Sequence, residues 1–147
     1  MQLIAAGVTR ATERGVSIEA AAAEIVAEAR ANNRRLPGLG HRVHTVDPRV
    51  EVLFDLARQD GNDGDGVRFV RALQDATAKA VKVLPINIDG ALAALLFDLG
   101  FPPEAGKLLF IIARVAGLTA EVAEEYSREK PMRIRIPVEY DGLPPES

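Results

Sequence analysis

The sequence predicts an all-helical domain followed by an extended C-terminal arm. Apolar residues recur with helical spacing in successive stretches, whereas a strict two-residue alternation occurs only over residues 133–140. A single strand-like stretch has no second strand to pair with, so we interpret it as an extended arm. The chain has 147 residues, 48% of them hydrophobic and 27% charged, which is typical of one globular domain. We divide it into a helical part, residues 1–129, and an arm, residues 130–147.

Composition excludes several classes of protein. Eighteen basic and 21 acidic residues give a net charge of −3, and no basic stripe interleaved with aromatic residues suggests a nucleic-acid partner. The absence of cysteine excludes disulfides and thiolate chemistry. His41 and His44 are three residues apart on a glycine-containing stretch without a carboxylate motif, so we expect no metal site. No long uncharged apolar run and no leader-like N-terminus is present, so we expect no membrane contact and a cytoplasmic location.

The first three expected helices follow from caps and apolar spacing. A helix over residues 2–13 ends at Gly15, and Ser17 caps a second helix that ends near Asn32. A third helix starts at Asp47-Pro48, because aspartate suits the cap position and proline the first turn. It runs into the acidic, glycine-rich residues 60–66, whose spacing does not fit a calcium loop, so we expect a surface loop there.

Three more helices are expected after that loop. The fourth carries apolar residues from Val67 to Val81 and ends before Pro85. The fifth follows Asn87 and is marked by a leucine stripe, and the sixth starts at Pro103 with a bend at Gly117. The stripe consists of Leu92, Leu95, Leu96 and Leu99, and the core-facing positions expected on the sixth helix are Leu108, Ile111, Ile112, Val115, Leu118 and Val122.

The segment Leu36-Pro37-Gly38-Leu39-Gly40-His41 is the first candidate site. Its glycines allow a tight turn that brings backbone close to a ligand, and His41 follows before any helix begins. Arg49 stands near the start of the third helix, so a histidine and an arginine bracket one short loop. This arrangement can hold a small carboxylate, because a guanidinium binds carboxylates in bidentate fashion. The alternative is an ordinary surface turn with an exposed histidine.

Asp89 and Arg114 are two further candidates. Asp89 lies in the first turn of the fifth helix, where an acid either interacts with the helix dipole or acts as a general base. Arg114 lies within an apolar run and needs either a path to solvent or an anionic partner.

Five motifs, in this order and spacing, resemble those of the citrate synthase family, which includes methylcitrate synthases and citryl-CoA lyases. They are Pro37-Gly38-Leu39-Gly40-His41-Arg42-Val43, Asp47-Pro48-Arg49, Asn87-Ile88-Asp89-Gly90, Ala113-Arg114-Val115-Ala116-Gly117 and Lys130-Pro131. The resemblance spans about residues 5–140 and implies the helical small domain of that fold, with its closing helices and C-terminal arm.

The resemblance implies roles for the candidate residues. The histidine matching His41 hydrogen-bonds the ketone of oxaloacetate and supplies a proton, and the aspartate matching Asp89 removes a proton from the methyl group of acetyl-CoA. The arginines matching Arg49 and Arg114 bind the oxaloacetate carboxylates. An arginine of the arm reaches the active site of the other subunit; Lys130 stands at the usual position here, and Arg133 or Arg128 is the candidate replacement.

Coenzyme A is implied as part of a substrate, with no permanently bound cofactor. The backbone of Leu36, Gly38, Leu39 and Gly40 is expected to lie against the adenine, and Lys82 to meet a phosphate. The implied small-molecule partners are acetyl-CoA or a related acyl-CoA, together with oxaloacetate or citrate. The resemblance also implies a homo-oligomer or a second polypeptide that carries the large domain.

Two departures lead to two functional hypotheses. A second family histidine, which stabilises the enol, would fall at or before Met1, and the large domain that precedes this region is absent; the segment from His41 to Arg49 is also one residue shorter than in many citrate synthases. One hypothesis is a citrate synthase-like enzyme that condenses acyl-CoA with oxaloacetate, or cleaves citryl-CoA, once another chain supplies these parts. The other is a non-catalytic module that binds CoA or a dicarboxylate, or an interaction module left from a truncated citrate synthase.

Overall fold

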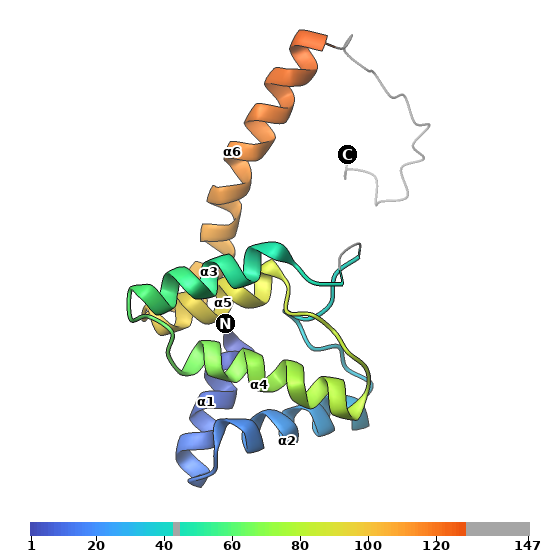
Figure 1. Ribbon diagram of the computed structural model, residues 1–147, viewed down its shortest axis with the longest axis vertical. Coiled ribbons are helices and arrows are strands. Elements are labelled where there is room, and N and C mark those ends of the chain that lie inside the picture. Colours follow the sequence, from blue (N-terminus) through green and yellow to red (C-terminus); the bar gives the residue numbers. More distant parts are fainter. Residues whose placement is uncertain (43–44, 129–147) are drawn as a thin grey trace, which may run out of the picture. The chain divides into compact units, whose positions relative to one another are not determined.

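The computed structural model describes residues 1–42 and 45–128, and these residues form the all-helical fold that the sequence predicts (Figure 1). The helices are α1 (Gln2–Arg14), α2 (Ile18–Ala31), α3 (Pro48–Gln59), α4 (Asp65–Ala80), α5 (Ile88–Asp98) and α6 (Ala105–Arg128). The chain consists of two compact units, Met1–Phe110 and Ile111–Ser147, which we describe separately. The predicted arm, residues 130–147, lies outside the described residues.

Caps set the helix ends, and those at Gly15, Ser17 and Asp47 were expected from the sequence. Gly15 adopts a left-handed conformation with φ 62° and closes α1. The side chains of Ser17, Asp47 and Asn87 accept hydrogen bonds from the first backbone N–H groups of α2, α3 and α5. These bonds satisfy donors that have no partner within the helix, which explains why each helix begins where it does.

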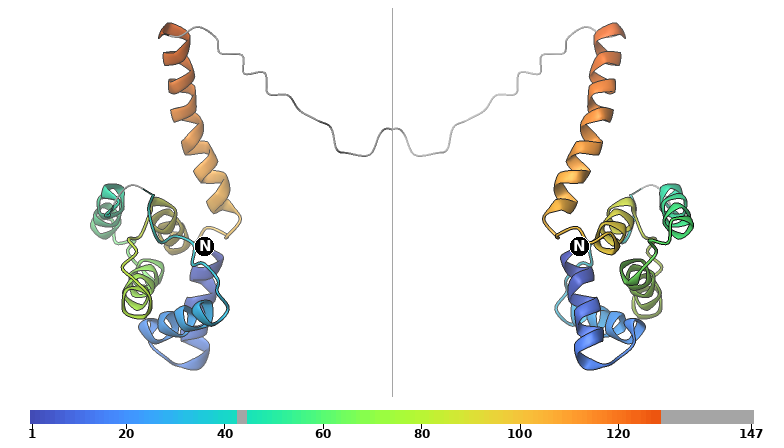
Figure 2. Two further views of the ribbon diagram at one scale, coloured as in Figure 1. Left: turned by 90° about the vertical axis from the view of Figure 1, so that its right-hand side faces the viewer. Right: turned by 90° about the vertical axis from the view of Figure 1, so that its left-hand side faces the viewer.

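Helix α4 is the centre of the first unit, where it packs against α1, α2 and α5, while α3 packs against α5 (Figures 1 and 2). Phe54, Phe69 and Leu73 are fully buried at this centre. The carboxylate of Asp98, at the end of α5, accepts hydrogen bonds of 3.0, 2.6 and 3.0 Å from the N–H groups of Gly64, Gly66 and Val67. This side chain therefore caps α4 from a neighbouring helix and fixes the position of α5.

The most buried residues of α5 are small residues and not its leucines. Small residues, namely Gly90, Ala91 and Ala94, are buried against the core, whereas Leu99 is 51% exposed. Leu92 and Leu96 line a cavity instead. The small residues allow the α5 backbone to approach its neighbours closely, and apolar spacing alone could not distinguish this face from the leucine stripe.

Helix α6 also departs from the prediction. It starts at Ala105 rather than Pro103, continues through Gly117 without interruption, and contains no buried residue. The apolar positions that we expected to face a core are exposed, with values of 60% at Leu108, 66% at Ile112 and 52% at Val115. The periodicity correctly predicts an apolar face on a helix, but not that this face is exposed.

Candidate active site

The His41 loop, residues 36–41, is joined to the start of α5 by backbone hydrogen bonds. The N–H of Gly40 donates to the carbonyl oxygen of Pro85 at 2.7 Å, and the N–H of Asn87 donates to that of Gly38 at 3.1 Å. Leu39 and Ile86 form an isolated antiparallel bridge between these bonds. Residues 38–40 are therefore held alongside residues 85–87. His41 directly follows the first segment, and Asp89 lies two residues after the second.

Two glycines allow this close approach. A Cβ atom on Gly38 would lie 2.9 Å from the Cα of Gly90, and one on Gly90 would overlap the carbonyl oxygen of Gly38. Gly38 and Gly40 have φ values of 86° and 88°, a region that side chains disfavour. The glycines in both motifs are thus required for the contact between the His41 loop and α5.

The Asn87 side chain reinforces the same contact. Its Nδ2 donates to the carbonyl oxygen of Gly40 at 2.8 Å, while its Oδ1 accepts from the N–H of Gly90 at 3.1 Å. One half-buried side chain thus caps the helix that carries Asp89 and holds the residue before His41.

Asp47 joins the start of α3 to the start of α5. Its carboxylate accepts hydrogen bonds of 2.9 and 2.8 Å from Nε and Nη2 of Arg49, and one of 3.1 Å from the N–H of Ile88. Hydrogen bonding from the Arg49 guanidinium lowers the pKa of Asp47 to about 2, although burial of the carboxyl opposes this shift. Asp47 is 1% exposed and therefore a buried, ionised anchor for Arg49.

The guanidinium of Arg49, which Asp47 holds, also interacts with the negative charge of Asp89. The pKa of Arg49 is raised chiefly by its hydrogen bond with Asp47, and the negative charge of Asp89 raises it further. Asp89 is exposed, and its carboxylate makes no hydrogen bond within residues 1–42 and 45–128. His41 is half-buried on the adjoining loop. The first unit thus brings an acid, a histidine and an arginine to adjacent segments.

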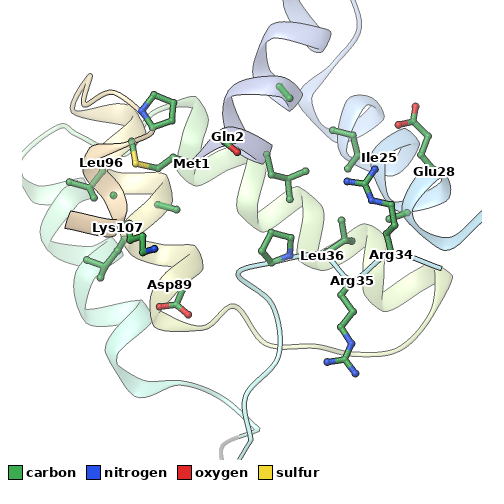
Figure 3. A pocket seen from close by; sticks show the side chains of 18 of the residues that line it. Met1, Gln2, Ile25, Glu28, Arg34, Arg35, Leu36, Asp89, Leu96 and Lys107 are labelled. Carbon is green, nitrogen blue, oxygen red and sulfur yellow. The ribbon is translucent and has the colours of Figure 1, made fainter. Parts of the chain in front are cut away.

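A cavity of about 990 Å³ lies beside Asp89 (Figure 3). It is lined by the start of α1, the end of α2, residues 34–37, one face of α5 and the start of α6. Lys107 lies near Asp89, and Arg34 lies near Ile25 and Glu28 on the other side of the view (Figure 3). The cavity is large enough for a nucleotide-sized ligand.

The other predicted residues have different positions. Leu36 lines the cavity, whereas Lys82 is exposed after the end of α4 and is absent from the cavity wall. Arg114 is exposed on the part of α6 that belongs to the second unit. Arg133 and His44 lie outside the described residues.

Asp47 and Asn87 are site residues whose full roles the sequence analysis missed. Both were recognisable as helix caps, but their bonds to Ile88 and Gly40 span 41 and 47 residues and leave no local signal. Arg34 and Arg35 were missed too, although two adjacent arginines directly before a predicted ligand-binding loop were a usable signal.

The described residues contain neither a metal-binding cluster nor a helix that could cross a membrane. No group of three or more His, Asp or Glu residues among them is arranged to hold a metal ion. Within the same residues, no helix combines the length and the apolar character that crossing a bilayer requires.

Comparison with known proteins defines the class to which this fold and site belong. Residues 6–135 match the family described as "Citrate synthase, C-terminal domain". Citryl-CoA lyase from Hydrogenobacter thermophilus superposes with a TM-score of 0.73 and 35% identity, over 98% of this chain and 57% of that one. Citrate synthase from Thermotoga maritima superposes with a TM-score of 0.66 and 32% identity, over 85% of this chain and 35% of that one.

Among characterised sequences, 2-methylcitrate synthase 2 of Corynebacterium glutamicum is 35% identical over 115 residues, which are 76% of this chain and 29% of that protein. Citrate synthase of Mycolicibacterium smegmatis is 30% identical over 117 residues, 77% of this chain and 30% of that protein. The chain therefore belongs to the citrate synthase family and corresponds to its C-terminal domain. It spans less than a third of the length of these two relatives.

Proposed function

We propose that this chain supplies the small-domain part of an active site that condenses an acyl-CoA with oxaloacetate, or cleaves citryl-CoA in the reverse direction. The observation that carries the proposal is the pairing of the His41 loop with the start of α5, because it holds two proton-transfer groups on adjacent segments. Family membership supports this general chemistry.

In the condensation direction, the carboxylate of Asp89 takes a proton from the carbon next to the thioester carbonyl, which gives an enolate, or an enol if the second histidine donates a proton to the thioester oxygen. That carbon then attacks the ketone of oxaloacetate, and a carbon–carbon bond forms. His41 donates a proton to the ketone oxygen as it becomes an alcohol. Asp89 suits the role of base because it is exposed beside the cavity and its carboxylate accepts no hydrogen bond from the described residues.

The substrate carboxylates are assigned to Arg49, Arg114 and Arg133. Arg49 carries five N–H donors, and Asp47 accepts from two of them, the one on Nε and one of the two on Nη2. The donors of Nη1 remain for a substrate carboxylate, while the buried Asp47 fixes the orientation of the guanidinium. Such fixed cations favour charge that develops during the reaction.

Coenzyme A is assigned to the side of the site that carries the His41 loop. Leu36 lines the cavity together with Asp89, and Gly38, Leu39 and Gly40 follow in the paired backbone segment. An adenine against this backbone places the thioester of the same ligand toward Asp89. Lys82 stays a candidate phosphate contact from outside the cavity wall.

The proposed enzyme needs the large domain and second histidine, from another polypeptide or within a larger oligomeric assembly. The exposed apolar face of α6 supports this requirement, because uncovered patches of this kind mark interaction surfaces. Residue Met1, at the start of α1, lines the same cavity as Asp89. A histidine supplied near this point would face the same ligand as Asp89.

The test is a thiol-release assay with oxaloacetate and acetyl-CoA or propionyl-CoA. The purified chain is assayed alone and mixed with a large-domain fragment of the C. glutamicum 2-methylcitrate synthase 2. We expect CoA release in the mixture only, because the thiol is freed when water hydrolyses the thioester of the condensation product. If neither sample turns over while CoA or oxaloacetate still raises the melting temperature, the chain is the non-catalytic binding module and the proton-transfer roles are withdrawn.

A further inference from the structure

Lys107, in the first turn of α6, lines the cavity near Asp89. Both residues contribute to the cavity wall, and Figure 3 shows the Lys107 side chain ending near the Asp89 carboxylate. Lys107 and Asp89 both belong to the first compact unit, Met1–Phe110, so their proximity is a property of that unit. The cavity therefore carries a cation near the proposed base.

The position of Lys107 is not explained by the stability of its own helix. The first turn of a helix is the positive end of the helix dipole, which favours acids and disfavours a lysine, and no acid lies in the first turn of α6. Across residues 1–42 and 45–128, Lys107 forms no ion pair and no side-chain hydrogen bond. Arg10 also lines the cavity, but its guanidinium donates to both carboxylate oxygens of Glu28 at 2.7 and 3.1 Å. Unlike Arg10, Lys107 is thus available to a ligand.

The separation of the two charges suits an acyl group that lies between them. Lys107 and Asp89 line one cavity, yet among the described residues they form no ion pair with each other. Removal of a proton next to a thioester carbonyl needs a base at the carbon and a hydrogen-bond donor at the carbonyl oxygen. These are two different atoms, so a base and a donor in direct contact would leave no room for them.

The wall around the two charges is largely apolar. Leu92, Ala93 and Leu96 line the cavity along α5 after Asp89. Lys107 and Asp89 are exposed in the chain alone, and a bound acyl-CoA would cover them. Electrostatic interactions are stronger where apolar side chains and a ligand exclude water. An ammonium group here can therefore stabilise a negative oxygen more strongly than it could on an open surface.

We propose that Lys107 is a further catalytic residue, whose ammonium group binds the thioester oxygen and stabilises the negative charge that develops there. When the C–H bond breaks, its proton passes to the Asp89 carboxylate and its electron pair forms the new carbon–carbon double bond. The electron pair of the carbonyl π bond moves to the oxygen, to which Lys107 donates a hydrogen bond while keeping its proton. The inference rests on the proposed function for the reaction. Lys107 lies outside the family motifs and acts in addition to the second histidine.

The experiment is calorimetric titration of the full chain with two CoA thioethers. Carboxymethyl-CoA carries a carboxylate where the enolate carries its negative oxygen, whereas S-isobutyl-CoA is a neutral thioether of similar shape. Lys107→Met is compared with Lys79→Met, which removes the same charge from an exposed position on α4 outside the cavity. We expect wild type and Lys79→Met to bind carboxymethyl-CoA at least about tenfold more tightly than S-isobutyl-CoA, and Lys107→Met to lose this preference. Melting curves check folding, and Lys107→Met should melt no lower than wild type.

Kinetics of the mixture with the large-domain fragment separate this inference from the proposed function. In that mixture we expect Lys107→Met to lower kcat at least about tenfold with little change in KM for the acyl-CoA, and Lys107→Arg to restore part of the rate. If the wild-type mixture shows no turnover while the preference for carboxymethyl-CoA still depends on Lys107, the anion-binding site stands and the proposed function fails. Equal preference in wild type and Lys107→Met, no binding of either probe by wild type, or an unchanged kcat for Lys107→Met in an active mixture would overturn the role.

Discussion

Asn87 donates a 2.8 Å hydrogen bond from its side chain to the backbone carbonyl of Gly40, the residue before His41. Because the same side chain caps the helix that begins with Ile88 and Asp89, it couples the positions of the proposed acid and base. This bond spans 47 residues, whereas the cap bond is local. Substitutions of Asn87 can therefore test its role in positioning His41 separately from its role as a helix cap.

Asn87→Asp is expected to keep the cap but lose the bond to Gly40, since a carboxylate oxygen cannot donate. We expect kcat of the enzyme reconstituted with the large-domain fragment to fall about tenfold or more, with a small change in melting temperature. Asn87→Ala removes both bonds, and we expect a loss of about 1–3 kcal/mol of unfolding free energy. Ser17→Ala, which removes only the cap of α2, is the control and should leave kcat unchanged. Equal kcat in wild type and Asn87→Asp would refute the positioning role.

The lowered pKa of Asp47 predicts that the folded chain loses stability in acid. Its pKa is about 2 in the folded chain against an ordinary value of 3.8, so the unfolded state binds the proton more readily. The stabilisation is present above pH 3.8 and is lost as pH falls toward 2, with a size of at most about 2 kcal/mol.

The measurement is chemical unfolding of wild type and Asp47→Asn between pH 2 and 7. The variant is expected to be less stable at neutral pH and to lack this part of the acid dependence. Asp55→Asn, which removes an exposed ion pair with Arg58, is the control. Parallel pH profiles for wild type and Asp47→Asn would contradict the assignment.

Gly90→Ala tests the close contact between α5 and the His41 loop. The added methyl group would overlap the carbonyl oxygen of Gly38, so we expect a loss of about 1–3 kcal/mol and weaker CoA binding. Gly117→Ala is the matched control, because a Cβ there meets no neighbouring atom and alanine favours a helix. Thermal unfolding and CoA titration measure both effects, and a Gly90→Ala protein as stable as wild type would show that the contact is not tight.

The apolar face of α6 predicts self-association of the chain when it is alone. Ile112 and Val115 are 66% and 52% exposed, and burying such side chains between molecules is favourable. The double variant Ile112→Glu with Val115→Lys should have a lower mass by sedimentation than wild type. Its melting temperature should not be lower. Glu124→Gln is the control, because helical spacing places it on the side of α6 opposite Val115. A wild-type chain that stays monomeric at high concentration would contradict the prediction.

The helices could be predicted from the sequence because helix caps and apolar spacing depend on residues that are close together along the chain. Ser17 and Asp47 cap their helices as expected, and Asp89 lies in the first turn of α5 as expected. The leucine stripe correctly marked α5 as a helix, but periodicity cannot show that Ala91 and Ala94 are among its buried residues.

The coupling within the site could not be predicted from spacing. The bonds from Asp47 to Ile88 and from Asn87 to Gly40 depend on how α3 and α5 pack, which no local pattern encodes. The exposed face of α6 was predicted as apolar but not as uncovered, because what covers a helix depends on parts outside it.

The central claim is that His41 and Asp89 perform the proton transfers. Its most direct test is kcat for CoA release by His41→Ala and Asp89→Asn, each reconstituted with the large-domain fragment and compared with Arg68→Gln. We expect roughly 10²–10⁴-fold lower kcat for either site variant, unchanged kcat for Arg68→Gln, and folded protein in every case. Turnover at the wild-type rate in His41→Ala or Asp89→Asn would remove that residue from the mechanism.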